Sequence, residues 1–167
     1  MANPSPSGGK AKDETAICGL PRNALFESRD AERVAKKMSH ETALLLAALL
    51  ALQVKHFLAD FVLQSTYQFR TKAIYGHVGG FIHSGLHILG TVPALLILNA
   101  SPRAIAIVLV AEFVIHYHTD WTKAHIDRRY HWGYGDQRYW MLFGADQLVH
   151  QLTYLAILYV LAAGLIS

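Results

Sequence analysis

The chain has 167 residues, enough for one domain, and 53% of them are hydrophobic while only 16% are charged. Because soluble domains carry roughly 25% charged residues, this composition argues against an ordinary water-soluble protein and predicts a membrane protein. The single cysteine excludes an internal disulfide and a cysteine-based metal site, and the net charge of +3 is too small to indicate a nucleic-acid partner. The ten histidines are the main anomaly of the composition.

The N-terminal residues are predicted to form a tail and a surface helix. Residues 1–20 are rich in Pro, Ser, Gly and Lys, and we expect them to be disordered because they have too little apolar surface to fold. Residues 21–40 mix charges of both signs with apolar side chains, which predicts an amphipathic helix on the membrane surface. No apolar segment follows the start, so we do not expect a secretory signal.

Apolar runs dominate the remaining part, residues 41–167, and occupy residues 42–63, 81–99, 104–119 and 140–166. Each run approaches the ~20 residues with which a helix crosses a bilayer. The sequence therefore predicts an all-α, polytopic membrane protein, a four-transmembrane-helix bundle with a short N-terminal surface helix. Trp121, Trp132 and Trp140 lie in or beside the polar segment before the last run, as is typical of side chains at a membrane interface.

Polar residues recur at intervals of four inside these runs, so each run has one polar stripe along a helix face. The stripes consist of His56, Asp60 and Gln64; His83 and His87; Glu112, His116 and Asp120; and Asp146 and His150. Because short connections make consecutive spans antiparallel, all stripes lie toward the same side of the membrane. An ionisable residue within a span costs about 2.5–3.5 kcal/mol unless it finds a partner inside the bundle. The stripes therefore predict one shared polar site.

Imidazole nitrogens and carboxylate oxygens are the ligands that suit zinc, iron or manganese. The candidate metal ligands are His56, Asp60, His83, His87, His116, Asp120, Asp146 and His150. With Glu112 they exceed the four ligands of one zinc ion, so either two metals are bound or some carboxylates orient a histidine. Asp60 and Asp120 are the candidates for a catalytic general base.

Three lysines lie near the predicted site. Lys72 and Lys123 are candidates for contact with a lipid phosphate, although snorkelling or pairing with Asp120 is equally ordinary for such side chains. Lys55 is rotated by about 100° from His56 on a helix, so we expect it to face another helix or to snorkel.

Four segments together resemble a family of bacterial and phage integral membrane proteins catalogued as domain of unknown function number 3307. They are "HFLADFVLQ" with Lys72 downstream, "FIHSGLH", "HYHTDWTK" and "DQLVH". The resemblance covers about residues 55–152 and implies a helical membrane fold. It implies no reaction, and Glu112 and His118 are not parts of the family pattern.

The leading functional hypothesis is a membrane-embedded metal-dependent hydrolase that acts on a lipid or other amphiphile, with zinc favoured and iron as the alternative. A di-iron oxygenase or desaturase is the second hypothesis, because helix bundles can hold two metals by Glu and His side chains. The third is a proton or ion pathway, or an accessory subunit of a membrane complex.

The expected partner is membrane lipid, with a homo-oligomer or a larger membrane complex left open and no nucleic acid. The expected location is the bacterial inner membrane. Lys and Arg residues near the spans are equally numerous on both sides, so the positive-inside rule does not set the orientation. The basic segment 123–138 alone favours a site that opens toward the cytoplasm.

Overall fold

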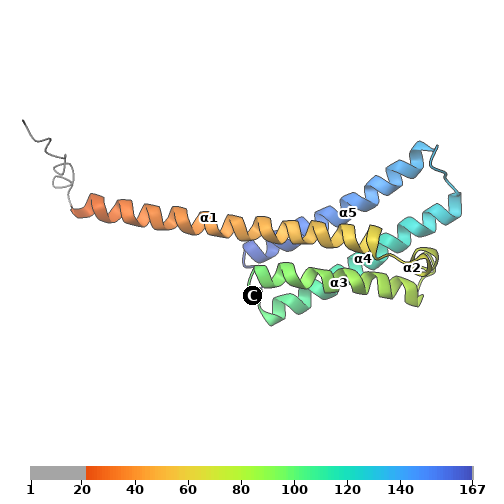
Figure 1. Cartoon of the computed structure of the whole chain (residues 1–167), viewed down its shortest axis with the longest axis horizontal. Coiled ribbons are helices and arrows are strands. Elements are labelled where there is room, and N and C mark those ends of the chain that lie inside the picture. Colours follow the sequence, from red (N-terminus) through yellow and green to blue (C-terminus); the bar gives the residue numbers. More distant parts are fainter. Residues whose placement is uncertain (1–21, 167) are drawn as a thin grey trace, which may run out of the picture. The chain divides into compact units, whose positions relative to one another are not determined.

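The computed structural model describes residues 22–166, and this part contains helices and no strands (Figure 1). In chain order the elements are α1 (Arg22–Phe57), the π-helix η1 (Leu58–Val62), α2 (Thr66–Thr71), α3 (Val78–Ile97), α4 (Pro102–Tyr130) and α5 (Gln137–Ala162). The all-α class is confirmed for these residues. The predicted tail, residues 1–20, lies outside them, and residues 22–40 belong to α1 rather than to a helix of their own.

The chain divides into two units, Met1–His40 and Glu41–Ser167, and the second unit is the one described from here on. Helices that are long and apolar enough to cross a membrane occupy Ser28–Val62, Val78–Ile97 and Pro102–Tyr130. The prediction of four spans is therefore confirmed for the first three apolar runs and not for the fourth. A helix, α5, does form there. Its apolar run is interrupted by polar side chains, which lower the mean hydropathy; they are Asp146, Gln147, His150 and Gln151.

Capping residues explain where α4 begins and ends and where α5 begins. The Ser101 side chain accepts a hydrogen bond from a backbone N–H in the first turn of α4, where Pro102 also lies. His131 ends α4 in the left-handed conformation, with a φ of 55°. Asp136 caps α5 by accepting the backbone N–H of Arg138, and the hydrogen bonds from the Arg138 side chain and backbone lower the pKa of the Asp136 carboxyl. These caps fix the short connections between consecutive helices.

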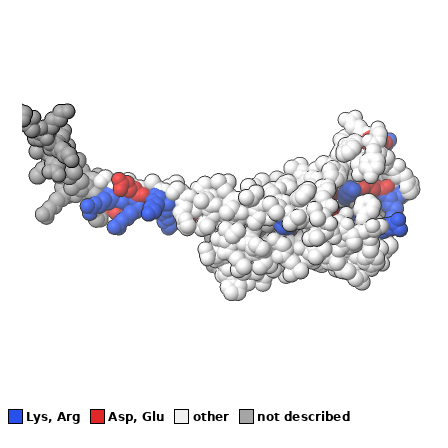
Figure 2. Space-filling view, in the orientation of Figure 1, with Lys and Arg blue, Asp and Glu red and all other residues white. Residues whose placement is uncertain are grey.

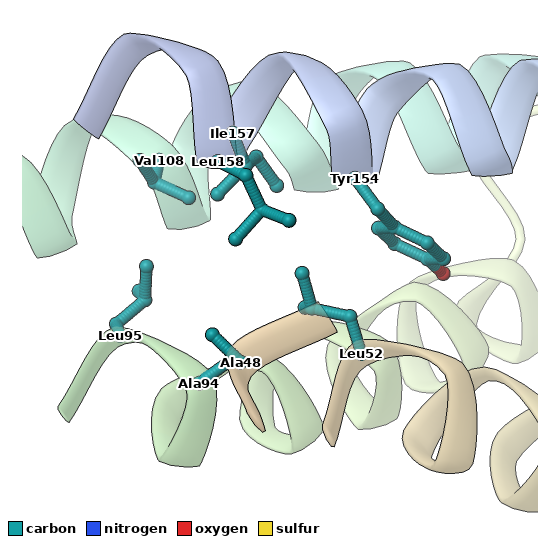
Figure 3. Packing of buried hydrophobic residues seen from close by; sticks show 8 residues of the cluster. All are labelled: Ala48, Leu52, Ala94, Leu95, Val108, Tyr154, Ile157 and Leu158. Atoms are coloured by element: carbon teal, nitrogen blue, oxygen red, sulfur yellow. The ribbon is translucent and has the colours of Figure 1, made fainter. Parts of the chain in front are cut away.

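Buried apolar side chains of four helices pack against one another in a core (Figure 3). Its buried members are Ala48 and Leu52 of α1, Ala94 and Leu95 of α3, Val108 of α4, and Tyr154, Ile157 and Leu158 of α5. Along every helix the cluster lies one or two turns from the polar stripe. Since lipid is as apolar as these side chains, close packing rather than removal of apolar surface from water holds the cluster together.

The outer surface of the helices is apolar as well. Leu50, Leu89, Val110 and Leu155 are each more than half exposed. Figure 2 shows that the Lys, Arg, Asp and Glu side chains visible on residues 41–167 gather mostly at one end, and that most of this face has none. A polar interior inside an apolar exterior is the arrangement expected of a protein surrounded by lipid.

Two glycines of α3 mark close contacts between elements. A Cβ added at Gly90 would lie 3.0 Å from the Cβ of Lys55, so the absence of a side chain lets α1 place Lys55 against α3. A Cβ added at Gly79 would lie 1.9 Å from the Thr71 hydroxyl oxygen of α2. Both contacts lie next to the polar end of the unit.

Candidate metal centre

Five histidines meet at the polar end of the bundle. His56 comes from α1, His83 and His87 from α3, His116 from α4 and His150 from α5, and each is at most 4% exposed. The ring centroids of His87 and His116 lie 3.7 Å apart, and those of His116 and His150 lie 4.2 Å apart. The spacing of four residues places both α3 histidines on one helix face. Imidazoles from four helices are thus brought into one cluster.

The π-helix η1 places Asp60 among these histidines. In η1 a backbone hydrogen bond of 2.8 Å spans five residues instead of four, which widens the turn. The Oδ1 atom of Asp60 lies 3.1 Å from the Nε2 atoms of both His83 and His87, and its Oδ2 atom lies 3.3 Å from Nε2 of His56. One carboxylate therefore contacts three imidazoles from two elements.

Asp120 of α4 faces Asp60 across His83. Its Oδ2 atom lies 2.9 Å from Nε2 of His83 and 3.6 Å from Nε2 of His116, while its Oδ1 atom lies 3.3 Å from Nε2 of His150. The Nζ atom of Lys72 lies 3.3 Å from Oδ2. Because His83 Nε2 also contacts Asp60, this nitrogen lies between the two carboxylates.

Asp146 lies at the margin of the cluster. Its Oδ1 atom is 3.5 Å from Nε2 of His150, and its Oδ2 atom accepts a hydrogen bond of 3.2 Å from the Gln147 amide. The Oε1 atom of Gln147 in turn lies 2.9 Å from Nε2 of His56. These contacts suit groups that orient a histidine, as the outer partners of metal ligands do.

Two groups of side chains could hold a metal ion. The first comprises Asp60, His83, His87 and His116, and the second comprises His116, Asp120 and His150. Within each group one donor atom per residue lies within 4.8 Å of the others. His56 and Asp146, which were also predicted as ligands, lie in neither group. The structure thus brings all the candidate ligands into one region, and which of them bind metal stays a prediction.

The donor distances fit a zinc site. With zinc–ligand bonds of about 2.0–2.1 Å, ligand atoms at adjacent corners of a tetrahedron lie roughly 3.3–3.4 Å apart. The N–O separations around the two aspartates run from 2.9 to 3.6 Å. Most of these separations also suit ordinary hydrogen bonds, so distances alone do not distinguish a metal site from a hydrogen-bonded cluster.

His116 favours a metal site. Its Nε2 atom is buried and has no hydrogen-bond partner among the described residues, although it belongs to both groups of donors. A buried polar atom left without a partner costs about 1–3 kcal/mol. A metal ion bound by the surrounding nitrogens and oxygens would supply that partner, so the residues present fit the metal that the sequence predicts.

A buried ion pair lies between the histidine cluster and the apolar core. Lys55 Nζ pairs with Glu112 Oε1, lies 4.5 Å from the centroid of the Tyr154 ring, and donates to the backbone oxygen of His87 at 3.4 Å. The Tyr154 hydroxyl lies 3.0 Å from Nδ1 of His56. Lys55 faces another helix, α4, and does not snorkel. The sequence signal for this pair is two opposite charges at similar depth in the first and third apolar runs, which run parallel because consecutive spans are antiparallel.

The cluster opens into a cavity of about 210 Å³. Both predicted catalytic carboxylates, Asp60 and Asp120, line it, together with Lys72 and Lys123. Lys72 is only 9% exposed and pairs with Asp120, whereas Lys123 Nζ lies 2.8 Å from Oδ2 of Asp127. The predicted head-group contacts therefore lie at the opening of the cavity, and each already has a carboxylate partner.

The family model described as "Protein of unknown function (DUF3307)" matches residues 45–166. The matched stretch includes every candidate ligand, from His56 to His150. No curated protein and no solved structure matches the chain. Because the match covers more than half of the chain, the resemblance noted from the sequence motifs is confirmed, and the chain belongs to the DUF3307 family.

Proposed function

We propose that this protein is a membrane-embedded metal-dependent hydrolase that acts on a lipid or another amphiphile at the His/Asp cluster. The proposal rests on one observation above all, the buried and unpartnered Nε2 atom of His116 between two groups of metal-ligating side chains. Zinc is favoured because nitrogen and oxygen donors suit it. The cavity at Asp60 and Asp120 supports access by a substrate from the membrane surface.

Different residues of the chain would bind the metal and accept the proton. Asp60, His83, His87 and His116 would hold the metal, which when bound supplies Lewis-acid activation of water. Asp120 would then be free to accept a proton, because it lines the cavity beside this group. Its pairing with Lys72 holds the carboxylate toward the cavity. A nucleophilic side chain is not required.

The position of the apolar core supports a site with one opening rather than a proton or ion pathway. Beyond the Lys55–Glu112 pair, the buried side chains of the core cluster are apolar apart from the Tyr154 hydroxyl, which points to His56. A pathway would need polar or water-accessible groups through that end as well.

Metal analysis of the purified full-length protein tests the proposal. We expect about one or two zinc ions per chain by elemental mass spectrometry. His116→Ala should lose them, while His118→Ala is the matched control, because His118 lies on the exposed side of the same helix and bonds to the Val114 backbone oxygen at 2.7 Å. Circular dichroism establishes that both variants are folded. A wild-type protein that is folded and metal-free would refute the proposal.

The same measurement separates the hydrolase from a di-iron oxygenase. The two groups of possible metal ligands support a site with two metals, which either enzyme could use. Iron retained in anaerobically prepared protein, together with an oxygen-dependent product, would favour the oxygenase.

We further propose that the protein lies in the bacterial inner membrane with the cavity open to the cytoplasm. The basic residues within 123–138 support this orientation. In a Cys18→Ser background, labelling of a Gly133→Cys variant in whole cells by a membrane-impermeant thiol reagent would contradict it.

A further inference from the structure

Cations surround the opening of the cavity. The cavity at the cluster and a neighbouring groove of about 310 Å³ share Phe69, Lys72 and Lys123 in their walls, so the two lie side by side. The groove is also lined by Arg70 and Arg128. Four cationic residues thus line these two adjoining hollows.

These cations keep free hydrogen-bond donors. Lys72 contacts one carboxylate oxygen of Asp120, and Lys123 contacts one carboxylate oxygen of Asp127. An ammonium group has three N–H donors and a guanidinium has five, so each side chain can bind a further acceptor. Arg128 donates to the backbone oxygen of Arg70 at 2.7 Å, which holds its guanidinium at the groove.

Metal binding would shift the charge balance of the opening toward positive. The cavity lining contains the carboxylates of Asp60, Asp120 and Asp146. A divalent cation held by Asp60 and the three histidines of its group would add two positive charges to this lining, which already contains Lys72 and Lys123. The loaded site would therefore attract an anion.

Aromatic rings lie beside the cations. Phe61 and Phe69 line the cavity and are 57% and 60% exposed, and Tyr139 and Phe143 lie within 6 Å of Lys123 Nζ by ring centroid, at 5.7 and 5.9 Å. Exposed rings next to cations suit a ligand with an anionic head and an apolar chain, because the cations can bind the head while the rings contact the chain.

We propose that this opening binds the phosphate of a phosphomonoester amphiphile, which makes the protein a lipid phosphatase. This inference rests on the proposed hydrolase function. In the reaction, a water oxygen bonds to phosphorus and the bond from phosphorus to the alcohol oxygen breaks. The alcohol oxygen takes up a proton, and the products are inorganic phosphate and the free alcohol. No oxidant or reductant is needed.

Binding and turnover of dodecyl phosphate by the zinc-loaded full chain in a neutral detergent test the inference. We expect Lys123→Met to weaken binding, measured by calorimetry, by about tenfold or more, because it removes a charge-assisted hydrogen bond. Lys123→Arg should restore most of it. Arg138→Met is the matched control, since Arg138 is an exposed cation paired with Asp136 outside the cavity lining. Equal affinity of Lys123→Met and wild type would overturn the inference.

Further measurements distinguish a failure of this inference from a failure of the proposed function. Lysine-dependent binding of dodecyl phosphate by a folded, metal-free protein would support the phosphate site and refute the hydrolase. Zinc-dependent hydrolysis of neutral dodecyl acetate without binding of dodecyl phosphate would overturn the phosphate site and support the hydrolase. Inorganic phosphate is the last probe, and binding as tight as that of dodecyl phosphate would overturn the amphiphile as the ligand.

Discussion

Removing the positive charge of Lys55 should destabilise the protein strongly, and removing both charges of its pair should not. Lys55 is 7% and Glu112 1% exposed, so neither group can reach water when its partner is lost. Breaking a buried ion pair costs about 3–5 kcal/mol, whereas replacing both partners by uncharged side chains of similar volume is often neutral. We therefore expect Lys55→Met to lower the free energy of unfolding by about 3–5 kcal/mol. Lys55→Met combined with Glu112→Gln should lower it by about 1 kcal/mol or less.

Thermal unfolding in detergent measures this difference. For a chain of this size 1 kcal/mol corresponds to about 2–4 °C, so Lys55→Met should lower the Tm by about 6–20 °C. Intrinsic fluorescence of the three tryptophans reports unfolding. Arg103→Met, which removes an exposed cation at the start of α4, is the control and should change the Tm little. A double variant that is as unstable as Lys55→Met alone would refute the reasoning.

Three further predictions concern the parts that support the cluster. Tyr154→Phe removes the hydroxyl that contacts His56 Nδ1, and Nε2 of His56 lies 3.3 Å from Oδ2 of the proposed ligand Asp60, so the change should weaken zinc binding by about tenfold in competition with a chelating dye; unchanged affinity would contradict an orienting role. Gly79→Ala should cost about 1–3 kcal/mol because its Cβ would overlap a side-chain oxygen of α2, whereas Gly85→Ala, with nothing within 4 Å, should leave the Tm unchanged or raised. Because the neighbouring arginine lowers the pKa of the Asp136 carboxyl, the stability that Asp136 contributes is present above its unfolded pKa of about 3.9 and is lost as pH falls through the lower folded pKa. The Tm difference between wild type and Asp136→Ala should therefore shrink on acidification below that value, and a constant difference would contradict the assignment.

Helix periodicity alone predicts that the candidate ligands lie close together. A spacing of four residues and antiparallel connections are geometric properties of helices, so they place His83 and His87 on one face and level with His116 and His150 without any knowledge of packing. The outcome in the structure is a cluster with ring centroids as close as 3.7 Å.

Features that depend on packing between helices were not predictable in this way. The π turn at Asp60 has no local sequence signal, and it turns the carboxylate toward α3 while His56 keeps its contacts with α5. The pairing of Lys55 with Glu112 depends on the rotation of α1, which the missing side chain of Gly90 allows. The fourth apolar run does fold as a helix, α5, but its polar residues lower its mean hydropathy, so it is not among the helices apolar enough to cross a membrane.

The low hydropathy of α5 has a consequence for biogenesis. If the helices enter the bilayer in chain order, α5 follows α1, α3 and α4. The side chains that these three helices contribute to the cluster are then already in place. Asp146 and His150 of α5 then meet Asp120 and the other imidazoles, so partners already in place can offset the cost of moving its polar groups into lipid. Insertion of α5 would thereby depend on the assembly of the site itself. In a chain with a damaged cluster, α5 would stay outside the membrane, where quality-control proteases could recognise it.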